Sequence, residues 1–262
     1  MGKGEIKIER NTLNRRSKII EILNKRNNIS VSEISKDFDI SEVSVRNDLS
    51  HLEKKGLLIR TRGGAISKQP TNFDLNLNQR LKHNYKQKQH IGKRAVDFIK
   101  NGSTVIMDSG STVIEVARNI KGKKNIKLIT NSLPIAEIVA DNNEIEVIIA
   151  GGTLRPEMRS LVGMMSEKTI MNYHCDLAIL GTDSIDSEMG IFTQLENEAS
   201  LTQTMMKVST KTIVVTDSSK FGKKSFIKIA DISEIDILIT DDSISAIDIQ
   251  KLNKQGIDLE IV

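Results

Sequence analysis

A series of short runs rich in Val and Ile, separated by stretches with helical periodicity, constrains the fold of this chain more than any other feature. A strand that is buried on both faces has this pattern, and its alternation with helices is typical of parallel strands joined by crossover helices. The sequence therefore predicts an α/β domain whose mainly parallel sheet is covered on both faces. The expected strands are Ser103–Met107, Ile126–Ile129, Ile145–Ala150, Asp176–Leu180, Thr212–Val215 and Ile237–Ile239.

Small polar residues follow the carboxyl ends of these runs, which is where open α/β sheets bind ligands. The segment Asp108–Thr112 is Asp-Ser-Gly-Ser-Thr between a strand and a helix, so N–H groups at the helix start and three hydroxyls would suit a phosphate. Gly and Ser also form ordinary strand-to-helix turns, which leaves a structural role open. The chain has neither a P-loop nor a GxGxxG pattern. Other polar strand ends that could converge on one crevice are Thr130–Ser132, Gly151–Gly152, Gly181–Asp183 and Thr216–Lys220.

Charged residues near these strand ends have two interpretations each. Lys220 is either a ligand-binding ammonium or a surface lysine, and Arg155 either reaches a phosphate or is solvated. The nearby carboxylates either bind sugar hydroxyls or cap helices and solvate loops. These carboxylates are Asp183, Asp186, Glu196 and Glu198.

The first part of the chain has the helix pattern of a DNA-binding unit. An amphipathic helix is expected from about Arg15 to Lys25, with Asn14 as its N-cap. Ser30 and Glu33 have the spacing of a capping box that begins a short second helix. Ser41 caps a third helix after a tight connection. Two short helices, a tight turn and a longer third helix are the components of a helix-turn-helix.

The third helix separates a buried stripe from an exposed face. Its inward stripe is Val45, Leu49 and Leu52, and Gly56 supplies its C-terminal stop. The opposite face carries an arginine, which can read guanine, and an asparagine, which can read adenine, near the end that enters a major groove. The alternative is a solvent-facing helix in a structural bundle. Residues expected on this face are Glu42, Ser44, Arg46 and Asn47.

A basic hairpin is expected directly after this helix. Residues 57–66 predict two short strands around a turn, with Arg60 and Arg62 on one face at strand spacing. Such a wing suits phosphates or a minor groove. The first 90 residues have 19 Lys and Arg against 10 Asp and Glu, a net +9, whereas the remainder has 19 against 24, a net −5. This asymmetry indicates that only the first part meets a polyanion.

These residues resemble the N-terminal signature of DeoR-type bacterial regulators. The resemblance is carried by Ile40–Leu49, Leu52–Glu53, Gly56–Leu57, Arg60 and Gly63–Ala65. Asn47 stands where the family commonly has a second basic residue, which leaves the operator sequence and one phosphate contact open. The DNA-binding residues that follow from the pattern and the resemblance are Ser41, Glu42, Ser44, Arg46, Asn47, Arg60 and Arg62.

The larger part of the chain has blocks in the order of the DeoR-type C-terminal domain. In that family the domain has a fold similar to ribose-5-phosphate isomerases and CoA transferases, and it senses phosphorylated sugars or related metabolites. Asp108–Thr112 resembles the family's phosphate loop, with Ser111 in place of a usual Thr, and Ser184 stands where many members have Gly. Further matching blocks are Thr130–Ser132, Gly151–Gly152 with Arg155, Glu196–Ala199 and Asp217–Gly222. The effector-binding residues implied are Asp108, Ser109, Gly110, Ser111, Thr112, Asn131, Ser132, Gly152, Arg155, Asp183, Glu196 and Lys220.

The resemblance implies a winged helix-turn-helix over residues 1–66, a polar and basic linker over 67–89 and an α/β effector-binding domain over 90–262. It implies a sequence-specific DNA-binding regulator, a repressor of sugar or carbohydrate catabolism genes, whose operator binding is controlled by a phosphorylated sugar-like effector. The expected partners are a double-stranded DNA operator and that effector. Because recognition helices pair on operator half-sites, a homo-oligomer, dimer or tetramer, is also expected.

An enzyme of the sugar-phosphate isomerase type that carries a DNA-binding domain is the competing hypothesis. Glu196 or Glu198 would be its base and Lys220 its electrostatic partner. No spacing fixes that geometry, so we assign no catalytic residue and expect a protein that is not an enzyme. An architectural DNA-binding protein is a third interpretation, which leaves the polar strand ends unexplained.

The sequence also limits the compartment and the cofactors. Cys175 is the only cysteine, so neither a disulfide framework nor a zinc site can be assembled. No apolar run approaches the ~20 residues of a membrane span, and the first residues lack a signal-peptide core. We therefore expect a cytoplasmic protein without a cofactor, a metal or a membrane partner.

Overall fold

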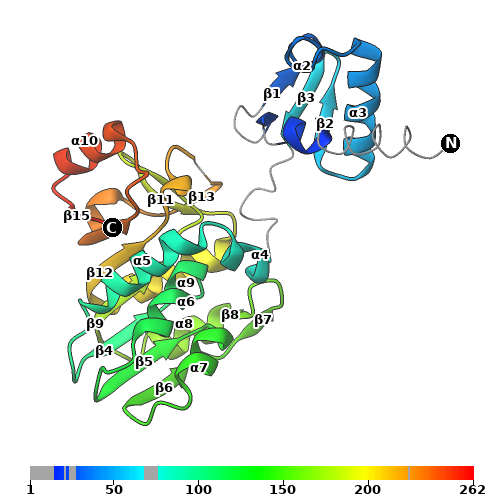
Figure 1. Ribbon diagram of the computed structural model, residues 1–262. Helices are drawn as coiled ribbons and strands as arrows, with labels where there is room; N and C mark the ends of the chain where they lie inside the picture. The colour runs from blue at the N-terminus through cyan, green and yellow to red at the C-terminus, as the bar shows by residue number, and fades with distance from the viewer. Residues whose placement is uncertain (1–14, 21, 24–27, 68–75, 224) are drawn as a thin grey trace. The chain divides into compact units, whose positions relative to one another are not determined.

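The computed structural model describes residues 15–20, 22–23, 28–67, 76–223 and 225–262 (Figure 1). The chain divides into two compact units, Met1–Thr71 and Asn72–Val262. The expected N-cap Asn14 and the expected helix end at Lys25 lie outside the described residues. Within the described ranges, no helix has the length and apolar character needed to cross a membrane.

The first unit has the predicted winged helix-turn-helix architecture. Residues 15–20 and 22–23 are helical, and the elements after them form a small antiparallel sheet with strand order β1-β3-β2. These elements are β1 (Asn28–Ser30), α2 (Val31–Phe38), α3 (Glu42–Lys54), β2 (Leu58–Thr61) and β3 (Gly64–Ser67). The stripe predicted to face inward on α3 is buried in the core of this unit, together with Ile19, Leu23 and Ile34.

The predicted caps of α2 and α3 are confirmed. The Ser30 hydroxyl accepts from the Glu33 N–H at 3.2 Å, and the Glu33 carboxylate accepts from the Ser30 N–H at 2.7 Å. Asp39 ends α2 in the left-handed region with φ of 49°. The Ser41 hydroxyl then accepts from the Ser44 N–H at 3.3 Å. Local hydrogen bonds therefore fix the turn between the two helices.

A buried carboxylate holds the first helix against α3. Asp48 is 2% exposed, and its two oxygens lie 2.7 Å from Arg15 Nε and 2.7 Å from Arg16 Nε. Both arginines are mostly covered, so their contacts offset the cost of burying the Asp48 charge.

The wing contains one strand more than the sequence predicted. The strand β1 pairs with β3, and a Cβ at Gly64 would lie 2.0 Å from the Ile29 carbonyl oxygen, so only glycine permits this approach. The Val31 N–H also donates to the Gly63 carbonyl at 2.9 Å. The prediction that Arg62 shares a strand face with Arg60 is wrong, because the turn between β2 and β3 takes Arg62 and Gly63.

The second unit is built on a seven-stranded sheet in which every neighbouring pair is parallel. Its order is β15-β14-β12-β9-β4-β5-β6. The six predicted strands are all present, as β4 (Thr104–Met107), β5 (Ile126–Thr130), β6 (Ile145–Ile149), β9 (Cys175–Leu180), β12 (Ser209–Val215) and β14 (Ile237–Thr240). The seventh strand, β15 (Asp258–Ile261), was not predicted, because its polar, partly exposed residues give no apolar run.

Helices cover both faces of this sheet (Figure 1). Val105 and Met107 of β4 lie in one core cluster with residues of α5, α6 and α7, whereas Ile106 lies in another cluster with residues of α8 and α9. The helices are α5 (Tyr85–Val96), α6 (Ser111–Asn119), α7 (Leu133–Val139), α8 (Met164–Ile170), α9 (Glu196–Lys207) and α10 (Ala246–Lys254). The predicted α/β class with a covered parallel sheet is confirmed.

Two small antiparallel sheets and two short 3-10 helices are inserted between the main strands. The first sheet is formed by β10 (Ser184–Asp186), β11 (Gly190–Thr193) and β13 (Ile227–Ala230), and the second by β7 (Thr153–Arg155) and β8 (Ser160–Val162). The 3-10 helices are η1 (Ser218–Lys220) and η2 (Ile232–Glu234).

Part of the expected linker belongs to the second unit. The helix α4 (Leu77–Lys82) begins with a capping box between Asn76 and Gln79, and Leu77 is buried in the main core. By its internal packing the second unit spans Asn72–Val262, so α4 and the start of α5 lie within it. The apolar periodicity of this segment is interrupted because α5 buries the charged side chain of Lys88. The Lys88 ammonium donates to the carbonyls of Arg80 at 2.6 Å and His83 at 2.7 Å.

The strand order places a topological switch point at the centre of the sheet. From β4 the chain proceeds outward through β5 and β6, and it then returns to the other side of β4 with β9. Because the loops after β4 and β9 diverge to opposite sides, a crevice opens at the carboxyl ends of these two strands.

Candidate functional site

Asp108 connects the two loops at the switch point. Its Oδ1 accepts from the Gly110 N–H at 2.8 Å, and its Oδ2 accepts from the Gly181 N–H at 2.9 Å. Burial raises the pKa of Asp108 to about 6, the negative charge of Asp183 adds to this shift, and the two N–H donors oppose it. The carboxylate therefore fixes the shape of the floor of the crevice.

The helix α6 begins at this floor without a side-chain cap. Gly110 is its N-cap residue, and no described side chain accepts from the N–H groups of its first turn. By contrast, α7 is capped by Ser132, whose hydroxyl accepts from the Ile135 N–H. The uncapped end of α6 carries partial positive charge and the hydroxyls of Ser111 and Thr112, which suits an anion.

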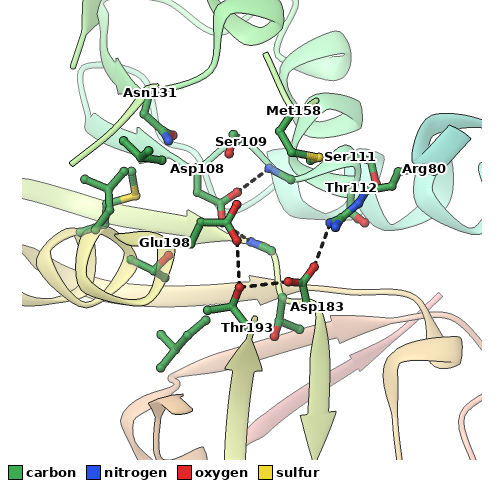
Figure 2. Close-up of a pocket in the computed structure, with 18 of the residues that line it drawn as sticks. Arg80, Asp108, Ser109, Ser111, Thr112, Asn131, Met158, Asp183, Thr193 and Glu198 are labelled. Atoms are coloured by element: carbon green, nitrogen blue, oxygen red, sulfur yellow. Dashed lines mark hydrogen bonds and ion pairs between the residues drawn. The ribbon is translucent and has the colours of Figure 1, made fainter. Parts of the chain in front are cut away.

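Figure 2 shows the cleft above this helix end, with side chains from both faces of the crevice pointing into it. Eight of the twelve predicted effector-binding residues line it. They are Asp108, Ser109, Gly110, Ser111, Thr112, Asn131, Asp183 and Lys220. Gly181, Thr182 and Glu198, which the sequence placed near this crevice without assigning them to the twelve, also line it. The other lining residues are Arg80, Met158, Val162, Thr193, Leu201, Thr202, Met205 and Ile229.

One wall of the cleft is a chain of charged and polar groups (Figure 2). Arg80 Nη1 lies 2.8 Å from Asp183 Oδ1, and Thr193 Oγ1 lies 3.0 Å from Asp183 Oδ2 and 2.9 Å from Glu198 Oε2. Arg155 forms an ion pair with Glu198. A hydroxyl has one proton, so Thr193 donates to one carboxylate at a time. The carboxylate to which Thr193 does not donate can therefore accept a hydrogen bond from a hydroxyl of a ligand.

Lys220 supplies a buried cation without a partner among the described side chains. It lies on η1, is 8% exposed, and its ammonium has no hydrogen bond or ion pair within the described residues. Burial lowers the pKa of Lys220 to about 8, and the nearby Asp217 charge opposes this shift. The Asp217 Oδ1 atom accepts from Asn84 Nδ2 at 2.6 Å and from the Ser219 N–H at 3.2 Å. An anionic ligand would stabilise the charged form of Lys220.

Asn131 supplies a hydrogen-bond acceptor on the side of the cleft opposite Lys220. It is 3% exposed, and its Nδ2 donates to the Leu161 carbonyl at 3.0 Å. Its Oδ1 is buried and has no partner among the described atoms. Leaving such an acceptor unpaired costs free energy, so the cleft favours a ligand with a hydroxyl or N–H donor at this point.

Four predicted effector-binding residues lie outside the lining of the cleft. Ser132 caps α7, and Gly152, at φ of 154°, sits where a Cβ would lie 2.3 Å from Ser166 Oγ. Glu196 is exposed in the first turn of α9. Arg155 contacts the wall of the cleft through its ion pair with Glu198. Ser132 and Gly152 have local structural roles that also account for their place in the pattern.

Arg80 and Thr193 are the wall residues that no sequence pattern indicated. Arg80 lies in a segment expected to be a linker, and Thr193 lies inside a small sheet that was not predicted. The capping box of Asn76 and Gln79 was the one local signal that α4 exists.

The exposed face of α3 carries the predicted base-reading groups. Glu42 and Arg46 form an ion pair of 2.6 Å, with side chains that are 48% and 54% exposed, and Asn47 is exposed beside them. Arg60 lies on β2 and Arg62 in the wing turn, both exposed. Ser41 and Ser44 are engaged with each other at the helix start. The unit thus presents two arginines on the wing and one on α3.

Both units match known families. Residues 15–71 match the DeoR-like helix-turn-helix domain, and residues 83–242 match the DeoR C terminal sensor domain. A protein of Escherichia coli O157:H7, named for transcriptional repression of the aga operon, is 36% identical over 253 residues, covering 96% of this chain and 94% of that protein. The transcriptional regulator GlpR of Haloferax volcanii is 33% identical over 244 residues, covering 93% and 95%. The glycerol-3-phosphate regulon repressor of Escherichia coli K12 is 28% identical over 247 residues, covering 94% and 98%.

Solved structures with partial similarity include two isomerases. Ribose 5 phosphate isomerase A from Neisseria gonorrhoeae gives a TM-score of 0.37 at 16% identity, covering 51% of this chain and 52% of that one. The Methanocaldococcus jannaschii enzyme gives a TM-score of 0.38 at 18% identity, covering 53% and 55%. The matching families and the full-length relatives are transcriptional regulators rather than enzymes. The chain therefore belongs to the DeoR family of DNA-binding transcriptional regulators.

Proposed function

We propose that this regulator represses carbohydrate catabolism genes and that a phosphorylated sugar-like effector, bound in the cleft between the ends of β4 and β9, controls its affinity for the operator. The observation that carries the proposal is the pairing, in one cleft, of a helix start at Gly110 without a side-chain cap and the buried ammonium of Lys220, which has no hydrogen bond or ion pair among the described residues. Both features attract an anion, and neither contributes to the packing of the core.

The phosphate end of the effector would bind at the start of α6. The N–H groups of the first turn and the Ser111 and Thr112 hydroxyls supply donors there, and Lys220 supplies a full positive charge. A phosphate dianion at this position would offset the burial cost that now lowers the pKa of Lys220.

The sugar end would bind along the opposite wall. Asn131 Oδ1 is a buried acceptor, and the carboxylates of Asp183 and Glu198 are further acceptors joined by the Thr193 hydroxyl. Acceptors in a row favour a ligand with several hydroxyls. The effector class is therefore a polyol or sugar with one phosphate, and a relative named for the glycerol-3-phosphate regulon supports that class.

Effector binding would reach the operator through α4. This helix is the first described element after residues 68–75, and it contributes Arg80 to the cleft through the ion pair with Asp183. Asn84, at the start of α5, likewise donates to Asp217 beside Lys220. An effector that draws Asp183 or Lys220 into new contacts changes how α4 is held, and it shifts the population of α4 positions by its differential affinity for them. A coupling free energy of about 1–3 kcal/mol would change operator affinity about 5-fold to 150-fold.

The regulator would act in the cytoplasm as a homo-oligomer, with two recognition helices on two operator half-sites. Repression relieved by the effector is the sense of the response that we propose.

A thermal-shift panel tests the effector class. Full-length protein is melted with a series of sugar phosphates, with each parent sugar, and with inorganic phosphate. A true effector at 100 times its dissociation constant stabilises the folded state by about 2.7 kcal/mol, and its parent sugar at the same concentration stabilises it far less. Each hit is then added to the operator complex and incubated alone with the protein. Release of DNA without turnover supports the proposal, turnover supports an isomerase, and the absence of any hit contradicts the effector class.

A further inference from the structure

Val43 is an apolar side chain that the recognition helix α3 holds in solvent. It is 64% exposed in the first turn, whereas Val45, two residues later, is fully buried. Asn47 lies one helical turn further on the same face, because residues four apart are neighbours on a helix surface. A β-branched residue slightly lowers helix propensity, and Val43 is not among the residues of the core of this unit.

The groups around Val43 are polar and already engaged. Glu42 and Arg46 form their ion pair on one side, and the hydroxyls of Ser41 and Ser44 lie 3.0 Å apart at the helix start. The methyl groups of Val43 are therefore exposed between side chains that form hydrogen bonds. This arrangement suits a small apolar group surrounded by hydrogen-bonding edges.

We propose that Val43 contacts the 5-methyl group of a thymine in the major groove and so selects a T·A pair in the operator. Thymine alone presents a methyl group in that groove, and apolar side chains contact it there. The inference rests on the proposed placement of the exposed face of α3 in the groove. Four residues span about 6 Å along a helix. Base pairs rise about 3.4 Å per step, so the thymine lies within about two base pairs of the base that Asn47 reads.

The test begins with an operator selected by the full-length protein from random DNA duplexes. Each thymine of the selected site is replaced singly by deoxyuridine, which keeps every hydrogen-bonding edge and removes only the methyl group. At one position in each half-site, wild-type affinity falls roughly fourfold, the value of one buried methyl-sized group. In Val43→Ser the same replacement has no effect, because the partner of the methyl group is gone.

Two further variants make the test specific. Val43→Thr keeps the branched shape and one methyl group, so it retains part of the sensitivity to deoxyuridine. Ile247→Ser removes a similarly exposed apolar side chain, 67% exposed on α10, and leaves the deoxyuridine profile at the wild-type pattern. Equal tolerance of deoxyuridine at every position by the wild type, or an unchanged profile in Val43→Ser, overturns the inference while sequence-selective binding stands. Failure of the wild type to select any sequence overturns the placement of α3 and the proposed function with it.

Discussion

Arg80 Nη1 lies 2.8 Å from Asp183 Oδ1, and the two side chains are 11% and 8% exposed. This ion pair joins the first helix of the larger unit to the wall of the effector cleft, 103 residues further along the chain. A partly buried pair with low exposure on both sides loses more when one charge is removed than a surface pair does. Its position makes it the natural contact through which ligand binding changes the placement of α4.

Asp183→Asn is expected to reduce the response of the regulator to its effector. The neutral amide holds Arg80 less strongly, so α4 is no longer tied to the state of the cleft. Fluorescence anisotropy measures the ratio of operator affinities without and with effector. For the wild type this ratio lies in the range of about 5 to 150, and in Asp183→Asn it falls toward 1. Glu188→Gln removes the exposed ion pair with Lys251 at 2.8 Å and serves as the control with a normal ratio. A wild-type ratio in Asp183→Asn would contradict the role of the pair.

Gly110→Val is expected to abolish effector binding while operator binding persists. A Cβ at this position meets Asp108 Oδ1 at 3.2 Å and Gly181 Cα at 3.4 Å, so the branched side chain must crowd the helix start where we propose that the phosphate binds. The measurement is an effector titration of the operator complex. Gly151→Ala is the matched control, since a Cβ there has nothing within 4 Å. An unchanged midpoint would place the phosphate elsewhere, and loss of all DNA binding would mean that the turn is purely structural.

Effector affinity is expected to fall as the pH rises above about 8. The pKa of Lys220 is about 8 without ligand, and a bound phosphate raises that pKa, so binding takes up a proton at higher pH. Affinity therefore falls by up to about tenfold per pH unit above 8 and is nearly constant below it, apart from the titration of the phosphate itself. Calorimetric titrations at pH 7 and pH 9 measure this difference.

Lys220→Met separates that titration from other effects of pH. The variant should bind the effector weakly at pH 7 and lose the extra decline between pH 7 and pH 9. Lys223→Met, which changes a neighbouring exposed lysine, should keep both the affinity and the decline. The same pH profile in Lys220→Met and in the wild type would rule out an ammonium–phosphate contact.

Arg46→Ala is expected to weaken binding to the cognate operator by about 1–3 kcal/mol, because the bidentate contact to a guanine that we predict for Arg46 would be lost. The side chain is 54% exposed, and within the described part of the chain its ion pair is with the exposed Glu42, so the fold should tolerate its removal. Mobility-shift titrations with cognate and scrambled duplexes measure the loss, which should be larger for the cognate DNA. Unchanged effector affinity in a thermal shift is the control, and equal operator affinity would remove Arg46 from the reading surface.

Operator affinity is expected to fall steeply with salt. Arg60, Arg62 and the other basic residues of the first unit would displace counterions from phosphates, which gives a linear fall of log affinity with log salt. Replacing both wing arginines by Gln should reduce the slope by about two, if each neutralises one phosphate. A flat dependence for the wild type would be incompatible with phosphate contacts by the wing.

The sequence predicted the parts of the fold whose signals are local. Capping by Ser30 and Ser41 depends on residues three apart, and the central strands are apolar runs because they are buried on both faces. The strand β1 is three residues long and depends on its pairing with β3, and the edge strand β15 is too polar to form an apolar run. Their formation is a tertiary effect that single-sequence patterns do not contain.

The candidate site was predictable to the extent that it follows strand ends. Asp108–Thr112 directly succeeds β4, so the link between sheet topology and ligand position placed it correctly in the cleft. Arg80 enters from a helix in the expected linker, and Thr193 enters from a small inserted sheet. Their positions depend on packing between segments far apart in sequence, and no local pattern marks them.

The close approach at Gly64 helps to make the DNA-binding unit rigid. The wing turn is hydrogen-bonded to the start of α2 through Val31 and Gly63, and α2 is fixed to α3 by the capped turn at Ser41. The arginines of the wing and the exposed face of α3 are thus held at one fixed separation, which would limit the conformational entropy lost on DNA binding. In the homo-oligomer that we propose, a signal from the effector would change the distance between two such rigid units rather than their internal shape, so operators with altered half-site spacing should respond to effector differently.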